Sequence, residues 1–254
     1  MKIYTFALQK GGTGKTSVSV SVAVELANAG KKVLLVDADP QGNATTWIYS
    51  NQFNNELAGV LLDTCTIQDA IKQTSVNNLY ILPTAGINGK LKEYADNTAG
   101  GKLAKIKNIL RGVSTDFDYC IIDTSPSFGN FEQSIFYATN EIITVLQLDN
   151  FSKDGIQIFI NRLQSFIKDL DPDAQKPVFN KIVLNAKNES YKLQSEYFEQ
   201  FKGLISNGFN IYTMPQDQAF KTAQASYKTV QEVTKKPDTI QSIKDIASDI
   251  LGGN

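Results

Sequence analysis

Short apolar runs alternate with amphipathic stretches along almost the whole chain. The apolar runs have the length and the branched or aromatic side chains of buried strands. We expect strands at Ile3–Leu8, Val33–Asp37, Leu79–Pro83, Tyr119–Asp123, Ile142–Gln147, Val178–Asn185 and Asn210–Met214. The stretches between them place apolar residues at helical spacing. We expect helices at Lys15–Ala29, Lys102–Val113, Phe131–Ala138, Asp154–Lys168, Lys192–Ser206 and Thr239–Leu251.

This alternation is typical of an α/β protein, in which a mostly parallel, twisted sheet carries helices on both faces. No composition break, internal repeat or Pro/Ser-rich linker divides the chain, so we expect residues 1–254 to form a single domain. The segment Asn43–Asn78 is polar and rich in asparagine. We expect it to form loops and short helices at the rim of the sheet.

Composition restricts the chemistry. Histidine is absent, which excludes Ser-His-Asp and Cys-His nucleophiles and His-ligated zinc. Cys65 and Cys120 lie far apart, so neither a disulfide framework nor a CxxC metal site is indicated, and both thiols should be unpaired. No run of about 18 apolar residues or signal segment is present, which predicts a cytoplasmic protein without a membrane span. With a net charge of −1, nucleic-acid binding would require a local basic patch.

The most specific motif follows the first predicted strand. Residues 9–17 read QKGGTGKTS and lead into a predicted helix. Glycines in such a loop let successive backbone N–H groups turn toward an anion, and the helix N-terminus adds partial positive charge. Lys15 would reach the terminal phosphates of a nucleotide, and the hydroxyl of Thr16 could bind Mg²⁺. The segment predicts a phosphate-binding loop.

The loop departs from the standard pattern G-x-x-x-x-G-K-[ST], because Gln9 stands at the first glycine position and Lys10 follows it. This form, the deviant Walker A loop, resembles the ParA/Soj/MinD family of P-loop ATPases. The resemblance implies a P-loop NTPase fold, ATP and Mg²⁺ as cofactors, and a homodimer in which Lys10 reaches the nucleotide of the other subunit. It assigns nucleotide contacts to Lys10, Gly11, Gly12, Thr13, Gly14, Lys15, Thr16 and Ser17.

Two further strands end in aspartates. Asp37 and Asp39 stand at the carboxyl end of the second strand, where ligands of such sheets bind. The surrounding run resembles the second ParA signature, which implies that Asp39 lies near the attacking water and Mg²⁺ and that Asp37 supports it. Asp123 ends an apolar strand in the Walker B form and would bind Mg²⁺ together with Thr16 and Asp39. In the segment after it, Ser125 replaces a proline that is usual in the family.

Catalysis is expected to depend on positioning and charge. The resemblance places Lys10, Lys15 and Asp39 in the catalytic set, but no glutamate follows Asp123 and no histidine can act as a base. NTPases that lack an arginine supplied by a partner turn over at about 10⁻⁴–10⁻² s⁻¹. We therefore expect a slow, switch-like ATPase whose turnover is gated by dimerisation and by a partner protein.

Two later segments match the family where its adenine pocket forms. Asn185 ends a predicted strand, and Pro215 and Asp217 follow the last one. A strand-end cap and a turn would explain these residues equally well. The guanine signature Asn-Lys-x-Asp is absent from the sequence, so the resemblance favours ATP over GTP.

Two features distinguish branches of the family. The helix expected at Thr239–Leu251 carries one lysine and two aspartates on its polar face, which favours packing on the sheet over the lipid-binding helix of MinD-type proteins. The chain also begins at its first strand, without the DNA-reading extension of larger ParA proteins, and so resembles a small, Soj-like ParA. Such proteins bind DNA without sequence preference through basic residues in the C-terminal third. The candidates are Lys187, Lys192, Lys202, Lys221, Lys228, Lys235 and Lys236.

The usual arginines of that region are not matched, since Gln216 and Phe220 stand there and Tyr227 replaces a glycine. A solvated lysine face therefore remains an open alternative to DNA binding. The expected function is that of a ParA-type ATPase for plasmid or chromosome partition, associated with the nucleoid and stimulated by a ParB-like centromere-binding protein. A dethiobiotin-synthetase-type enzyme and a MinD-like or other cargo-positioning ATPase remain alternatives. An iron–sulfur carrier is disfavoured because the two cysteines lack paired spacing.

Overall fold

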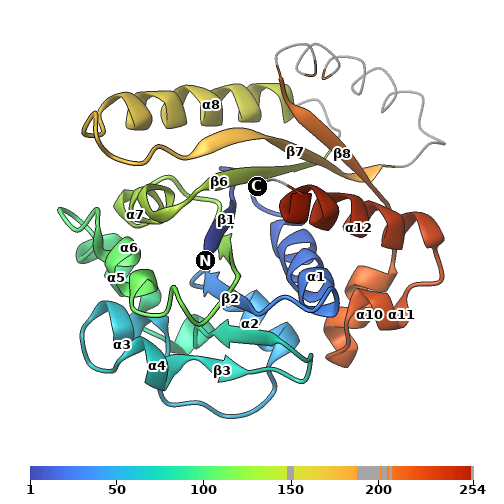
Figure 1. Cartoon of the computed structure of the whole chain (residues 1–254), viewed down its shortest axis with the longest axis horizontal. Helices are drawn as coiled ribbons and strands as arrows, with labels where there is room; N and C mark the ends of the chain where they lie inside the picture. The colour runs from blue at the N-terminus through green and yellow to red at the C-terminus, as the bar shows by residue number, and fades with distance from the viewer. Residues whose placement is uncertain (148–151, 188–200, 202–204, 206–207, 253–254) are drawn as a thin grey trace.

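The computed structural model describes residues 1–147, 152–187, 201, 205 and 208–252. These residues form an eight-stranded sheet in the order β3-β4-β2-β5-β1-β6-β7-β8, which runs from the bottom to the top of Figure 1. Neighbouring strands are parallel, apart from β3, which pairs antiparallel with β4. The strands are β1 (Lys2–Phe6), β2 (Val33–Ala38), β3 (Lys72–Gln73), β4 (Leu79–Leu82), β5 (Tyr119–Thr124), β6 (Glu141–Gln147), β7 (Val178–Lys187) and β8 (Asn210–Pro215).

Helices cover both faces of the sheet (Figure 1). One face carries α1 (Lys15–Asn28), α2 (Asn43–Ile48), α10 (Ala219–Ser226), α11 (Val230–Val233) and α12 (Pro237–Gly252). The other carries α3 (Leu57–Leu61), α4 (Ile67–Ala70), α5 (Leu91–Asn97), α6 (Lys105–Arg111), α7 (Asn130–Ala138) and α8 (Ser152–Lys168). A 3₁₀ turn, η1, spans Gly86–Asn88.

Strand β2 shows why the sheet needs two covering layers. Its residues alternate between the faces, so that Val33 and Leu35 belong to the core under α1, whereas Leu34 and Val36 belong to the core under α3. Both sets are buried. A strand buried on both faces reads as a continuous apolar run, and this is the signal that predicted it.

All seven predicted strands are present, and the predicted α/β class is confirmed. The first strand ends at Phe6 instead of Leu8, because the chain already turns into the loop there. Strand β3 was missed, since two residues at a sheet edge show no periodicity. The segment Asn43–Asn78 contains three short helices in addition to β3. The helix predicted at Lys192–Ser206 lies outside the described residues, apart from two isolated positions.

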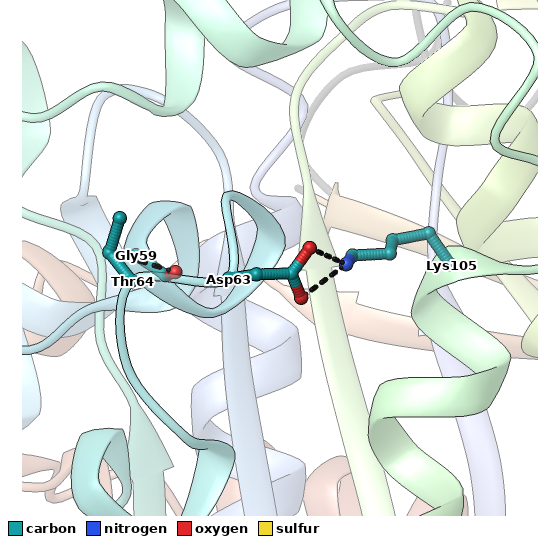
Figure 2. A network of polar contacts seen from close by, with 4 residues as sticks. All are labelled: Gly59, Asp63, Thr64 and Lys105. Atoms are coloured by element: carbon teal, nitrogen blue, oxygen red, sulfur yellow. Dashed lines mark hydrogen bonds and ion pairs between the residues drawn. The ribbon is translucent and has the colours of Figure 1, made fainter.

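A network of polar contacts ties this polar segment to α6 (Figure 2). Asp63 follows α3 in the left-handed region, with φ of 58°, and both of its carboxylate oxygens lie 2.7 Å from the Lys105 ammonium. The hydrogen bond from Lys105 lowers the pKa of Asp63. Next to it, the backbone N–H and the hydroxyl of Thr64 both donate to the Gly59 carbonyl, at 2.8 and 3.0 Å. The polar segment Asn43–Asn78 is therefore attached to α6 through Asp63.

Helix α12 packs against α1 and β8, as the charge pattern of its sequence predicted. Ile243, Ile246 and Ile250 lie buried between them. Below the helix, the ammonium of Lys181 contacts Glu141 at 2.6 Å and Asp249 of α12 at 3.1 Å. Among the described residues, no helix has the length and apolar character needed to cross a membrane.

Candidate nucleotide site

The loop between β1 and α1 has the backbone that a phosphate cradle requires. Gly12 and Gly14 adopt φ of 72° and 93°, in the left-handed region that side chains with a Cβ rarely occupy. Gly14 is also the N-cap of α1, and its carbonyl accepts the first helical hydrogen bond from Val18 at 3.0 Å. The loop therefore places the positive end of the α1 dipole at the carboxyl edge of the sheet.

Lys15 folds back over this loop. Its side chain is buried, and Nζ donates to the Lys10 carbonyl at 3.1 Å. Burial lowers the pKa of Lys15, while the nearby carboxylates of Asp123 and Asp39 oppose that shift. The ammonium group is thus held inside the loop beside two acids, and the structure brings together three residues that were predicted from separate motifs.

A short hydrogen bond joins Thr16 of the loop to Asp123 at the end of β5. The Thr16 hydroxyl donates to Asp123 Oδ2 at 2.7 Å. Asp123 is fully buried, and its Oδ1 has no hydrogen-bond partner in the described part of the chain. Burial raises the pKa of Asp123 to about 7. A buried oxygen that lacks a donor is suited to accept a cation or a water molecule bound to one.

Asp37 and Asp39 have different surroundings. The backbone N–H and the hydroxyl of Thr45 both donate to Asp37 Oδ2 at 2.7 Å, and burial raises the pKa of Asp37 to about 8. Asp39 accepts from the Gln41 backbone N–H at 2.9 Å. Asp37 therefore braces the loop after β2 against α2, while Asp39 lies close enough to influence Lys15 and Asp123.

Comparison with known proteins identifies the family. A family model described as "AAA domain" matches residues 1–176, which contain the loop, Asp39 and Asp123. The sporulation initiation inhibitor protein Soj of Bacillus subtilis is 34% identical over 175 residues, or 68% of either chain. The chain belongs to the ParA/Soj branch of the AAA domain family. The resemblance drawn from the deviant Walker A loop is confirmed, and the chain is a P-loop ATPase of this branch.

Solved structures confirm the fold. McdA from Cyanothece in complex with ATP has a TM-score of 0.86 at 20% identity, over 99% of this chain and 96% of that one. The septum site-determining protein MinD from Pyrococcus horikoshii, complexed with Mg-ADP, has a TM-score of 0.77 at 19% identity, over 98% of this chain and 95% of that one. Because both sequence identities are this low, the two comparisons show that the fold is shared and nothing more.

Ser125 lies in the segment after Asp123, where it holds the start of α7. Its hydroxyl donates to Glu132 Oε1 at 2.7 Å, and the Gly129 backbone N–H donates to Glu132 Oε2 at 2.9 Å. One buried carboxylate at the start of α7 thus holds both ends of this segment.

The residues predicted for an adenine pocket lie at the ends of the paired strands β7 and β8 and in the turn after β8. Asn185 Nδ2 donates to the Thr13 carbonyl of the ParA/Soj loop at 2.7 Å. Asp217 accepts from the Ala219 backbone N–H and from the hydroxyls of Thr234 and Thr239, which joins α10 to the start of α12. Burial would raise the pKa of Asp217, but these hydrogen bonds outweigh it and lower that pKa. Pro215 ends β8 at the same edge of the sheet.

Four of the candidate DNA-binding lysines lie on the α10–α12 side of the molecule, to the right in Figure 1. They are exposed: Lys221, Lys228, Lys235 and Lys236. Lys236 Nζ donates to the Gln216 carbonyl at 2.8 Å. The side chains of Lys187, Lys192 and Lys202 lie outside the described part of the structure.

Several site residues were not predicted from the ParA/Soj motifs. Thr45, Glu132 and Gln147 each hold a loop of the site through a hydrogen bond, and that of Gln147 joins distant parts of the chain. The single tryptophan, Trp47 of α2, donates its indole N–H to the Lys228 carbonyl at 2.7 Å. The strand-end position of Gln147 was the one available signal, since such positions face the ligand in sheets of this type.

Proposed function

We propose that this protein is a ParA-type partition ATPase, which binds ATP with Mg²⁺ at Lys10–Ser17, dimerises on ATP and hydrolyses it slowly. The observation that carries this proposal is the hydrogen bond between Thr16 and Asp123 next to Lys15. Among the described residues, Asp123 Oδ1 has no hydrogen-bond partner. A hydroxyl and a carboxylate next to a phosphate cradle are the protein ligands that an NTPase gives to Mg²⁺, with waters and phosphate oxygens completing the shell.

The chemistry of the remaining loop fits a polyphosphate. The Thr13 hydroxyl oxygen is buried and, among the described residues, has no hydrogen-bond partner. Lys15 now donates to a backbone carbonyl, a weaker acceptor than a charged phosphate oxygen. Nucleotide binding would satisfy both groups. Mg²⁺, when bound, would neutralise charge on the terminal phosphates.

The deviant lysine supports the dimer. Lys10 lies half-buried at the start of the loop, and its backbone carbonyl accepts from Lys15, so both lysines belong to one structural unit. In this proposal the side chain of Lys10 donates to the nucleotide of the partner subunit. Each ATP would then bridge two protomers, and hydrolysis would release them.

Asp39 is the residue that we place next to the attacking water. It follows β2 at the carboxyl edge of the sheet and influences the pKa of both Lys15 and Asp123. We assign it the positioning of water and of the Mg²⁺ shell. Without a histidine in the chain, turnover would depend on charge neutralisation by Lys10, Lys15 and the cation.

The downstream steps rest on the ParA/Soj relationship. The ATP dimer would bind DNA without sequence preference through exposed lysines such as Lys221 and Lys228, and would therefore associate with the nucleoid. A ParB-like centromere-binding protein would stimulate hydrolysis and reset the cycle. Pro215, at the edge of the sheet, remains our candidate for contact with adenine.

The test measures binding and turnover in one series. Titration of Mg-ATP into the protein should show saturable binding that Lys15→Ala abolishes and that Lys31→Ala, at an exposed lysine beyond α1, leaves unchanged. ATPase activity should be slow and should change when duplex DNA and the partition partner are added. Fast turnover that changes neither with duplex DNA nor with the partition partner would contradict the partition role and favour a metabolic enzyme.

A further inference from the structure

We propose that Gln147 and Asn185 form a carboxamide clamp that shapes the phosphate loop and so sets its affinity for the polyphosphate chain, whatever base is attached. The inference rests on the proposed function in one respect, because the ligand of the loop is taken to be a nucleoside triphosphate. It assigns Gln147 a role that no sequence motif indicates, and it moves Asn185 from base recognition to phosphate binding.

The two amides are matched to two neighbouring carbonyls of the loop. Gln147 ends β6 and Asn185 lies near the end of β7, and the two residues are register partners across the parallel pair. Gln147 Nε2 donates to the Gly12 carbonyl at 3.0 Å, and Asn185 Nδ2 donates to the Thr13 carbonyl at 2.7 Å. Adjacent strands lie about 4.8 Å apart and successive Cα atoms about 3.8 Å apart. Side chains at the ends of two neighbouring strands can therefore reach two consecutive peptide groups of the loop.

This arrangement orients the N–H groups that would bind phosphate. In a trans peptide the carbonyl and the following N–H point in opposite directions. Because the carbonyls of Gly12 and Thr13 are held toward β6 and β7, the N–H groups of Thr13 and Gly14 point away from those strands. The clamp would thus present two donors to an anion before the anion arrives, which lowers the cost of binding.

Gly14 shows how closely the clamp approaches the backbone. A Cβ on Gly14 would lie 2.0 Å from Asn185 Nδ2, far inside van der Waals contact. Gly14 also has a φ of 93°. The amide of Asn185 therefore occupies the space that any side chain at position 14 would need, and the glycine of the loop is required by this contact as well as by its backbone conformation.

A loop clamp and a base pocket predict different losses of affinity when Asn185 is replaced. If Asn185 read adenine, its loss would weaken ATP binding and leave the binding of GTP and of inorganic tripolyphosphate unchanged. If Asn185 and Gln147 shape the loop, the loss of either would weaken all three ligands to a similar extent. The base-free ligand therefore separates the two roles.

The experiment measures equilibrium binding of ATP, GTP and tripolyphosphate, each with Mg²⁺, to Asn185→Leu and Gln147→Leu. Leucine is close to both amides in size but cannot donate. The matched controls are Asn108→Leu and Gln241→Leu, at exposed positions on α6 and α12. We expect each clamp variant to lose about five- to tenfold in affinity for every ligand, which corresponds to one hydrogen bond, and the controls to bind like the wild type.

A second readout needs no ligand. Hydrogen exchange of peptides that cover residues 10–17 should be faster in both clamp variants than in the wild type and the controls, because the loop loses a restraint. Circular dichroism and thermal melts would confirm that the variants are folded at the temperature used.

Three results would overturn the clamp. One is a loss of ATP affinity alone in Asn185→Leu, which would restore the adenine role. Another is unchanged binding of all three ligands in Gln147→Leu, and the third is unchanged exchange of the loop in both variants. If the wild type bound no triphosphate, the proposed function would fail, while the exchange experiment would still decide whether the clamp exists.

Discussion

The hydroxyl of Thr16 lies 2.7 Å from Asp123 Oδ2, although the two residues are separated by more than a hundred positions in the sequence. The contact arises because β1 and β5 are parallel neighbours, so the loop after β1 and the last residues of β5 meet at one edge of the sheet. It leaves Asp123 Oδ1 without a partner among the described residues and so prepares the carboxylate for a cation.

The Thr16 hydroxyl is expected to couple nucleotide binding to Mg²⁺. Thr16→Ala removes a cation ligand and the hydrogen bond to Asp123, so the gain in ATP affinity that Mg²⁺ provides should fall about tenfold, the value of one charge-assisted contact of about 1.5 kcal/mol. Thr16→Ser keeps the hydroxyl and should behave like the wild type. Titrations of ATP with Mg²⁺ and with EDTA measure this difference. An equal Mg²⁺ effect in Thr16→Ala and the wild type would remove Thr16 from the metal site.

Asp39→Ala is expected to separate binding from hydrolysis. The variant keeps the loop and Lys15 and should bind Mg-ATP with an affinity near that of the wild type, but its turnover should fall by at least tenfold because the water is no longer positioned. Phosphate release under single-turnover conditions is the direct measurement. Asp116→Ala, at an exposed aspartate before β5, is the control and should turn over normally. Ordinary turnover in Asp39→Ala would exclude Asp39 from the mechanism.

The partly buried ion pairs beneath α12 should contribute to stability. Lys181→Met leaves the carboxylates of Glu141 and Asp249 facing each other without a cation, and we expect the free energy of unfolding to drop by about 2–4 kcal/mol. Lys92→Met breaks the exposed ion pair with Asp96 and should change the free energy of unfolding by less than about 0.5 kcal/mol. Urea denaturation measures both variants. If both variants changed the free energy of unfolding by a similarly small amount, the contacts of Lys181 with Glu141 and Asp249 would not be important for stability.

Stability should depend on pH through Asp217. Its hydrogen bonds lower its pKa in the folded protein, so folding favours the ionised form. The contribution is complete above the ordinary aspartate pKa of about 3.9 and is lost as the pH falls through the lower folded value. Asp217→Asn should therefore lower the urea midpoint relative to the wild type at pH 6, and the difference should shrink as the pH approaches 3. A difference that grows toward low pH would contradict this assignment.

Most of the fold could be predicted from the chain, because each strand buried on both faces is a continuous apolar run and the phosphate loop is a local motif. Contacts between distant segments could not. Gln147 holds Gly12, 135 positions away in the sequence, through a pairing that exists only once the sheet is assembled. Asn185 was predicted as part of the site through the resemblance to the ParA/Soj family, yet the atom that it contacts, the Thr13 carbonyl, depends on the register of β6 and β7.

Asp217 illustrates a second limit of sequence interpretation. Its place after the last strand fitted both a base pocket and a turn, and the two could not be told apart without the positions of Thr234 and Thr239. The structure shows all three acceptor contacts directed at the protein itself. The strand β3 was missed for a simpler reason, since a pair of residues has no measurable period.

The dimer is the central claim, and Lys10 tests it most directly. Light scattering of the protein with Mg²⁺ and the slowly hydrolysed analogue AMPPNP should give twice the 28.0 kDa mass of one chain, and a single mass with ADP. Lys10→Ala should remain a monomer with either nucleotide while still binding AMPPNP, and Lys31→Ala should dimerise normally. A wild-type protein that stays monomeric with AMPPNP, or a Lys10→Ala variant that dimerises as well as the wild type, would contradict the account.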